Sequence, residues 1–342
     1  MPSLYVATNG LSVWRSTDFG ETLERMPSGT GLYSGSRVWS LLPTPKGLLA
    51  GTDSGIYRWA PANNQWMPLP SPTDCQMITA LACAPDNPDV LLAGAQPGAL
   101  YRSEDSGQSW NKLDVAIAPH VSSGFGENTA FARGDRPLAR HWTRVTQIVF
   151  DPHDAKAVWA GVEIDGAWRS VDGGRRWDRS STGLKTQDVH GFAIVRGTAS
   201  SDGRRVVYAT TNKGTYLSHD DGATWQQQEF ASPWPYTRSI AARSDDGRVL
   251  FMTNGNGAPG TAGKLFRSNN SGGHWRDVNL PGAVESSLYF LATNPADPKL
   301  IFAATALGQF YRSTDGGERW TALPQRLGEV RALAWLPDQP QE

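Results

Sequence analysis

The chain has 342 residues and a formal net charge of −1, from 32 basic and 33 acidic side chains. This near-neutral balance argues against a broad nucleic-acid footprint, which needs a basic surface. No apolar run is long enough to span a membrane, and residues 1–6 lack the charged and apolar regions of a secretion signal. We therefore expect a cytoplasmic protein that binds neither nucleic acid nor a membrane.

A short motif, Ser-x-Asp-x-Gly-x-x-Trp, recurs along the chain between short apolar runs. Alternating apolar runs joined by a polar segment with glycine are typical of β-hairpins. We expect the Ser and Asp side chains to hydrogen-bond the backbone of their own turn, and the Trp to pack against the neighbouring unit. The copies begin, in chain order, at Ser16, Ser103, Ser170, Ser218, Ser268 and Ser313.

The spacing of the copies predicts seven units. The step from Ser16 to Ser103 is about twice the shorter steps, so a degenerate copy should lie inside it. Residues 55–66 fit, with the Ser-x-Asp core lost. Each unit predicts four strands, as in the third, at 78–85, 90–94, 99–103 and 110–113. The predicted fold is all-β, a single seven-bladed β-propeller over residues 1–342.

The two ends of the chain are predicted to share one blade. Residues 330–337 match the first strand of a unit, and residues 4–7 match the second. The last strand should therefore join the sheet of the N-terminal blade and close the ring, which hides sheet edges. Cys75 and Cys83 are too far apart along the chain of one blade to bridge, so we expect no disulfide.

One unit carries a long insertion near 114–143, between Ser103 and Ser170. Its position places it over the channel mouth, the face shared by the starts of the first strands and the loops between second and third strands. The insertion mixes His, Arg and aromatic residues, which favours a functional loop. A smaller insert at 254–263 lies on the same face and predicts a mobile lid.

The first strands of the blades each contribute two aligned residues to the channel mouth. The first position is occupied by Arg37, Met77, Arg144, Asp188, Arg238, Ser287 and Glu329. The second position is occupied by Trp39, Thr79, Thr146, His190, Ile240, Tyr289 and Arg331. The ligand-binding set that we predict from these positions and the insertion is Arg37, Arg144, Arg238, Arg331, Trp39 and Trp142.

Converging arginines in a narrow site need partners, because unpaired like charges are costly. One interpretation is a set of inter-blade ion pairs with Asp188, Glu329, Glu163 and Asp165. The other is an anion site, because the planar guanidinium suits carboxylate and phosphate.

Several groups at the mouth are candidates for acid–base or metal chemistry. The candidate catalytic residues are His141, His190, Asp188, Glu163, Asp165 and Tyr289. A divalent metal could be held by His120, His141 and His190 with Glu163 or Asp165. No cofactor is predicted, since no nucleophile elbow, phosphate loop or dinucleotide fingerprint occurs.

The repeated motif resembles the Asp-box, or BNR repeat, of sialidases, sortilin-type receptors, tandem-propeller xyloglucanases and photosystem II assembly factors. These relatives differ in activity, so the resemblance implies the fold alone. Sialidases have six blades and pair a Tyr nucleophile with a Glu, whereas Tyr289 is too far from Glu285 along an extended strand. The xyloglucanases use two carboxylates across a cleft between two propellers. The photosystem factors match in blade number and bind proteins.

Two functions stay open at this point. The first is a propeller that binds an anionic small molecule or a partner protein at the channel mouth. The second is a hydrolase or lyase, glycosidase-like, that acts on a carboxylate-bearing or sugar-like substrate in the same pocket. A paired acid–base set in a deep pocket would favour the enzyme. The sequence contains no recognisable catalytic set, which favours binding.

Overall fold

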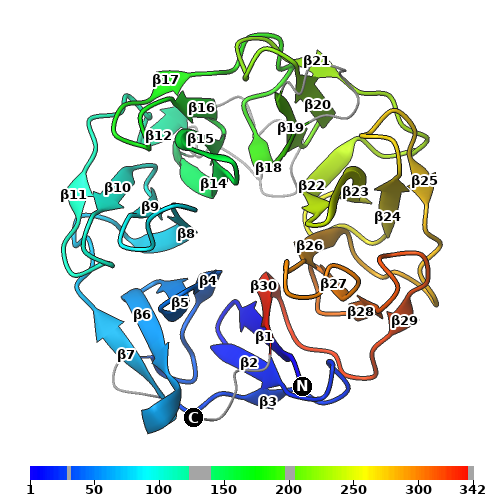
Figure 1. Ribbon diagram of the computed structural model, residues 1–342, viewed down its shortest axis with the longest axis horizontal. Helices are drawn as coiled ribbons and strands as arrows, with labels where there is room; N and C mark the ends of the chain where they lie inside the picture. The colour runs from blue at the N-terminus through cyan, green and yellow to red at the C-terminus, as the bar shows by residue number, and fades with distance from the viewer. Residues whose placement is uncertain (29–31, 123–139, 197–204, 338–342) are drawn as a thin grey trace, which may run out of the picture.

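The computed structural model describes residues 1–28, 32–122, 140–196 and 205–337. Seven four-stranded antiparallel sheets stand around a central channel (Figure 1). This arrangement confirms the predicted seven-bladed β-propeller. The described residues also contain a hairpin of β12 (His120–Ser122) and β13 (Arg140–Trp142), and a 3-10 turn at Pro61–Asn63. No helix in these ranges is long and apolar enough to cross a membrane.

Each blade runs from an innermost strand beside the channel to an outermost strand at the rim. Blade 1 consists of β30 (Val330–Leu336), β1 (Ser3–Thr8), β2 (Val13–Ser16) and β3 (Glu24–Arg25). Blade 2 consists of β4 (Val38–Thr44), β5 (Gly47–Thr52), β6 (Gly55–Ala60) and β7 (Gln65–Leu69). Blade 3 consists of β8 (Met77–Cys83), β9 (Leu91–Gln96), β10 (Leu100–Ser103) and β11 (Asn111–Lys112).

The other four blades repeat the same order. Blade 4 consists of β14 (Arg144–Asp151), β15 (Asp154–Glu163), β16 (Gly166–Ser170) and β17 (Asp178–Arg179). Blade 5 consists of β18 (Val189–Arg196), β19 (Arg205–Thr211), β20 (Gly214–Ser218) and β21 (Gln226–Gln227). Blade 6 consists of β22 (Tyr236–Arg243), β23 (Asp246–Gly255), β24 (Gly263–Ser268) and β25 (Arg276–Asp277). Blade 7 consists of β26 (Leu288–Ala292), β27 (Ile301–Thr305), β28 (Phe310–Ser313) and β29 (Thr321–Ala322).

The Ser-x-Asp motif forms the turn between the third and fourth strands, as predicted. In blade 5, Ser218 Oγ accepts from the Gly222 backbone N–H at 2.7 Å and donates to Asp220 Oδ1 at 2.7 Å. Asp220 Oδ1 then accepts from the Thr224 backbone N–H at 2.8 Å. Gly222 has φ +88°, which an L side chain rarely adopts. The equivalent serine-to-glycine bonds recur in the turns that begin at Ser16, Ser103, Ser170, Ser268 and Ser313.

The core lies between the blades. Trp225, at the end of the blade 5 turn, donates from Nε1 to the Ser180 carbonyl of blade 4 at 2.7 Å. It packs in one cluster with Trp159 of blade 4 and Val207 of blade 5. The motif tryptophan of blade 5 therefore packs at the interface with blade 4, as its size and position predict.

The ring closes through β30, which pairs with β1 (Figure 1). Ser3 stands opposite Leu336, and Val6 opposite Leu333. Trp335 is buried in a cluster that also contains residues of blade 7 such as Phe302. The structure therefore confirms that the last strand joins the sheet of the N-terminal blade and that this pairing closes the ring. Cys75 and Cys83 are free thiols, also as expected.

The longer of the two predicted insertions is only partly described, whereas the smaller one is described in full. Residues 123–139 lie outside the described ranges, and β12 and β13 flank them. The smaller insert forms a tight loop, in which Asn256 Oδ1 accepts from the Thr261 backbone N–H at 2.8 Å. Ser287 ties this loop to blade 7, since its Oγ donates to the Gly257 carbonyl at 2.6 Å. The second of these bonds ties the loop to blade 7, and its mobility stays a prediction.

Candidate functional site

Every innermost strand has a register shift at the same level of the channel. In β4, for example, Val38 and Ser40 pair with consecutive residues of β5, which leaves Trp39 as an extra residue. A β-bulge of this kind re-aims a side chain. The residues in these bulges, one blade after another from blade 2, are Trp39, Thr79, Thr146, His190, Arg238 with Ser239, Tyr289 and Arg331.

The bulges correct one position of the predicted alignment. In blade 6 the bulge holds two residues, because Thr237 and Ile240 pair with Asn254 and Met252. Arg238 therefore occupies the position that the sequence alignment gave to Ile240. Ile240 is only 5% exposed and lies in the core of the blade.

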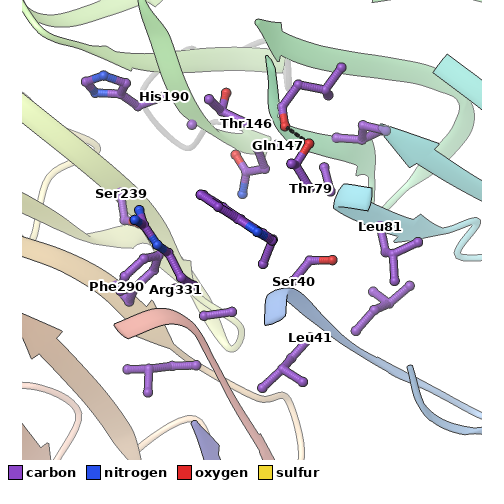
Figure 2. Close-up of a pocket in the computed structure, with 18 of the residues that line it drawn as sticks. Ser40, Leu41, Thr79, Leu81, Thr146, Gln147, His190, Ser239, Phe290 and Arg331 are labelled. Atoms are coloured by element: carbon purple, nitrogen blue, oxygen red, sulfur yellow. Dashed lines mark hydrogen bonds between the residues drawn. The ribbon is translucent and has the colours of Figure 1, made fainter. Parts of the chain in front are cut away.

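A cavity of about 320 Å³ occupies the channel at this level. Its wall includes Arg144, Arg238, Arg331, His190 and Trp39. Figure 2 shows Arg331, Ser239 and His190 on one side, and Leu41 and Leu81 on the other. Among the described residues no Asp or Glu belongs to this wall, so its charged members are cationic or, for His190, basic.

Two of the three arginines are paired within their own blades. Arg144 binds Glu163 of β15, and Arg331 binds Glu329 just before β30. Both guanidinium groups also lie over the Trp39 ring, at 4.9 Å and 4.3 Å from its centroid. Both ion pairs thus lie within one blade. One interpretation of the sequence had expected ion pairs between blades, and for these two arginines it is wrong.

Arg238 is different, because no hydrogen bond or ion pair to its guanidinium is found in the described part of the chain. The guanidinium lies 5.2 Å from the centroid of the Tyr289 ring. The Tyr289 hydroxyl is 3.2 Å from that of Tyr236, and burial raises the pKa of both phenols. Both phenols therefore stay neutral. Arg238 has an aromatic neighbour but no hydrogen-bonded carboxylate. Burial lowers its pKa, but the charges of Glu163 and Asp188 act on it from a distance and raise it.

His190 lies between a backbone carbonyl, to which it is hydrogen-bonded, and a carboxylate. Its Nδ1 lies 2.5 Å from the Thr237 carbonyl, so Nδ1 carries a proton, and its Nε2 lies 3.2 Å from Asp188 Oδ1. Burial raises the pKa of Asp188, but His190, Arg238 and Arg144 outweigh burial and hold that pKa below its usual range. Asp188 is therefore an ionised carboxylate behind the cavity wall.

Other predicted residues lie away from the cavity. Arg37 is exposed at the start of blade 2 and does not line the cavity. Asp165 binds Arg179 of β17 at 2.7 Å, on the outer side of blade 4, so it does not belong to the channel. Trp142 is 46% exposed on β13 and also lies outside the cavity wall.

The metal prediction depends on side chains that the structure does not describe. His120 and His141 fall in β12 and β13, but their side chains are outside the described set. Among the residues that are described, no group of three His, Cys, Asp or Glu could hold a metal ion.

The alignment missed the neighbours of the bulges. Ser40, Gln147, Ser239 and Phe290 follow or share the bulge positions and line the cavity too. The signal that could have found Ser40, Gln147 and Ser239 is a polar residue directly after a predicted mouth position, whereas Phe290 has no such signal.

The fold and channel place this chain among β-propellers, and the comparisons narrow the class. No family model matches the sequence. A xyloglucanase of Paenibacillus sp is 28% identical over 326 residues, which cover 81% of this chain and 30% of that protein. A xyloglucanase of Acetivibrio thermocellus is 23% identical, over 82% of this chain and 38% of that protein. The chain thus spans about a third of the length of these relatives.

Solved structures agree on the fold. A GH74 enzyme of Niastella koreensis superimposes with a TM-score of 0.63 at 22% identity, over 84% of this chain and 45% of that chain. A GH74 xyloglucanase of Xanthomonas campestris gives a TM-score of 0.61 at 22% identity, over 91% and 46%. The sequence relatives are glycosidases by name, which matches the second function left open above better than the first.

Proposed function

We propose that this protein is a glycosidase-type propeller that recognises a neutral β-glucan of the xyloglucan class. The observation that supports this is the sequence similarity to xyloglucanases along four-fifths of the chain. Because those relatives are about three times as long, their activity and substrate come to this chain only as a proposal.

The proposed glycan surface is the channel-mouth face. Tyr33 and Trp142 precede first strands on this face and are 56% and 46% exposed. Leu11 and Leu307 lie in loops between second and third strands and are 40% and 48% exposed. Pyranose rings carry apolar C–H faces that pack on aromatic and aliphatic side chains. Four exposed apolar residues on one face therefore suit a glycan that lies across the mouth.

Cleavage of a glycosidic bond needs a protonated acid and a second carboxylate. Asp188 is ionised, but it is 8% exposed and lies behind the cavity wall, so it does not reach a glycan at the mouth. We therefore place both reacting carboxylates outside the cavity wall.

The test is binding and hydrolysis of xyloglucan by the purified chain, with polygalacturonate as an anionic control polymer. Isothermal titration should give binding to xyloglucan oligosaccharides but not to oligogalacturonates. Trp142→Ala should weaken that binding at least tenfold, as the loss of a stacking aromatic typically does. Val171→Ala is the matched control, since Val171 is 61% exposed on the opposite, Ser-x-Asp face.

Release of reducing ends from xyloglucan by the purified chain, lost together with binding in Trp142→Ala, would support the hydrolytic step. Equal affinity of wild type for both polymers, or no binding to xyloglucan, would overturn the proposal.

A further inference from the structure

We propose that the central channel binds a small monocarboxylate with a short apolar body, at a site separate from the glycan surface. The carboxylate would lie against Arg238, and the hydrocarbon would point deeper into the channel. Three features of the cavity support this, namely its unpartnered donors, its cationic wall and an apolar ring below that wall.

The first feature is the lack of an acceptor for Arg238. Glu163 and Glu329 are already bound to Arg144 and Arg331, and Asp188 faces His190. A guanidinium presents five N–H donors and accepts nothing, so that of Arg238, which lines the cavity, can bind an acceptor there. An anion in the cavity would supply the missing acceptor.

The second feature is the cationic wall. Arg144, Arg238 and Arg331 line the cavity, and its described wall contains no carboxylate. A carboxylate, which only accepts hydrogen bonds, is complementary to guanidinium groups, which only donate them.

The third feature is an apolar ring two residues beyond the bulges. First strands run inward from the mouth, so these residues lie deeper than the arginines. The ring consists of Leu41, Leu81, Ile148, Leu291 and Leu333. Leu41 and Leu81 are labelled in Figure 2. Inorganic phosphate would leave this ring uncovered, whereas a carboxylate with a few methylene groups would fill it. The volume of about 320 Å³ limits the ligand to a small molecule.

The experiment is a titration of the whole chain with acetate, butyrate and hexanoate, with hexanamide as the neutral counterpart of hexanoate. Affinity should rise about fourfold for each methylene group that enters the apolar ring. Hexanoate should also raise the melting temperature, because a ligand of the native state stabilises it. Hexanamide and inorganic phosphate should bind at least tenfold more weakly than hexanoate.

Arg238→Gln should reduce hexanoate affinity at least tenfold, while Arg37→Gln, an exposed arginine outside the cavity, should leave it unchanged. Near-ultraviolet circular dichroism checks that Arg238→Gln retains its tertiary fold. Arg238→Lys keeps the charge and should recover part of the affinity if the first variant packs poorly.

Three results would overturn the site: no carboxylate binding to wild type, equal binding of hexanoate by wild type and Arg238→Gln, or tighter binding of phosphate than of hexanoate. Xyloglucan binding should be the same in Arg238→Gln and wild type, so failure of this site and failure of the glycan proposal are distinguishable.

Discussion

In each Ser-x-Asp turn the serine is buried, and the residue two positions later is half-buried or exposed. Ser218 is 1% exposed, whereas Asp220 is exposed. In blade 6 the acidic position is taken by Asn270, whose Oδ1 accepts from Ser268 Oγ at 2.9 Å and from the His274 backbone N–H at 2.8 Å. The turn geometry therefore needs the side-chain oxygen and not the negative charge.

The charge should instead make stability depend on pH. Burial raises the pKa of Asp220, but hydrogen bonds from Thr224 and Ser218 outweigh it and bring the pKa to about 2. Because this folded-state pKa lies below the unfolded value of about 3.9, the ionised group stabilises the fold above pH 4 and ceases to do so as pH falls through 2. Asp220→Asn should therefore lower the melting temperature at pH 7, and the difference from wild type should vanish near pH 2.

Thermal denaturation followed from pH 7 to pH 2 measures this. Asn270→Asp is the converse variant and should gain a steeper acid dependence in the same range. A difference between Asp220→Asn and wild type that stays constant down to pH 2 would mean that shape, and not charge, explains the effect.

At the scale of the element, β30 carries the closure of the ring. Trp335→Ala should cost about 3–5 kcal/mol of unfolding free energy, because the side chain is 2% exposed and packs where blades 1 and 7 meet. Trp142→Ala, at a 46% exposed position, should change that free energy by no more than about 0.5 kcal/mol. Urea denaturation measures both. Similar small losses in the two variants would show that β30 contributes little to closure.

The elements themselves could be predicted from the sequence, because their causes are local. Period-two alternation and the turn chemistry of Ser, Asp and Gly gave the blade hairpins, including the degenerate one at 55–66. The bulges could not be predicted, because a register shift depends on pairing with the next strand. For this reason the sequence alignment placed Ile240 at the bulge position of blade 6, which Arg238 occupies in the structure.

For the whole molecule, the ring and its closure followed from counting repeats, but the contents of the channel did not. Which carboxylate pairs with which arginine depends on side-chain directions. Asp165, for example, binds Arg179 on the outer side of blade 4, although its position in sequence placed it near the mouth. The cationic wall of the cavity could not be predicted either. It depends on Arg144 and Arg331 each being bound to a carboxylate of its own blade, and on Arg238 having no bound carboxylate.

The closure of the ring predicts that the chain can be circularly permuted. Because Ser3 pairs with Leu336, residues near the two ends of the described chain lie side by side. A circular permutant that joins these ends by a short Gly-Ser linker and opens between β7 and β8 should fold, with a melting temperature within a few degrees of the original. Near-ultraviolet circular dichroism and thermal melts test this, and a molten or aggregated permutant would contradict it.

The row of bulges couples recognition to folding. One residue per blade, or two in blade 6, stands outside the regular ladder, and all of these residues except Tyr289 line the cavity. Thr79 Oγ1 donates to the Val145 carbonyl of the next blade at 2.7 Å, and Thr146 Oγ1 donates to the Val189 carbonyl of the blade after that at 2.7 Å. The same side chains therefore line the channel and join neighbouring blades. A substitution at this level that alters what the channel admits would also loosen a blade interface, so new ligand preferences in this propeller would come at a cost in stability.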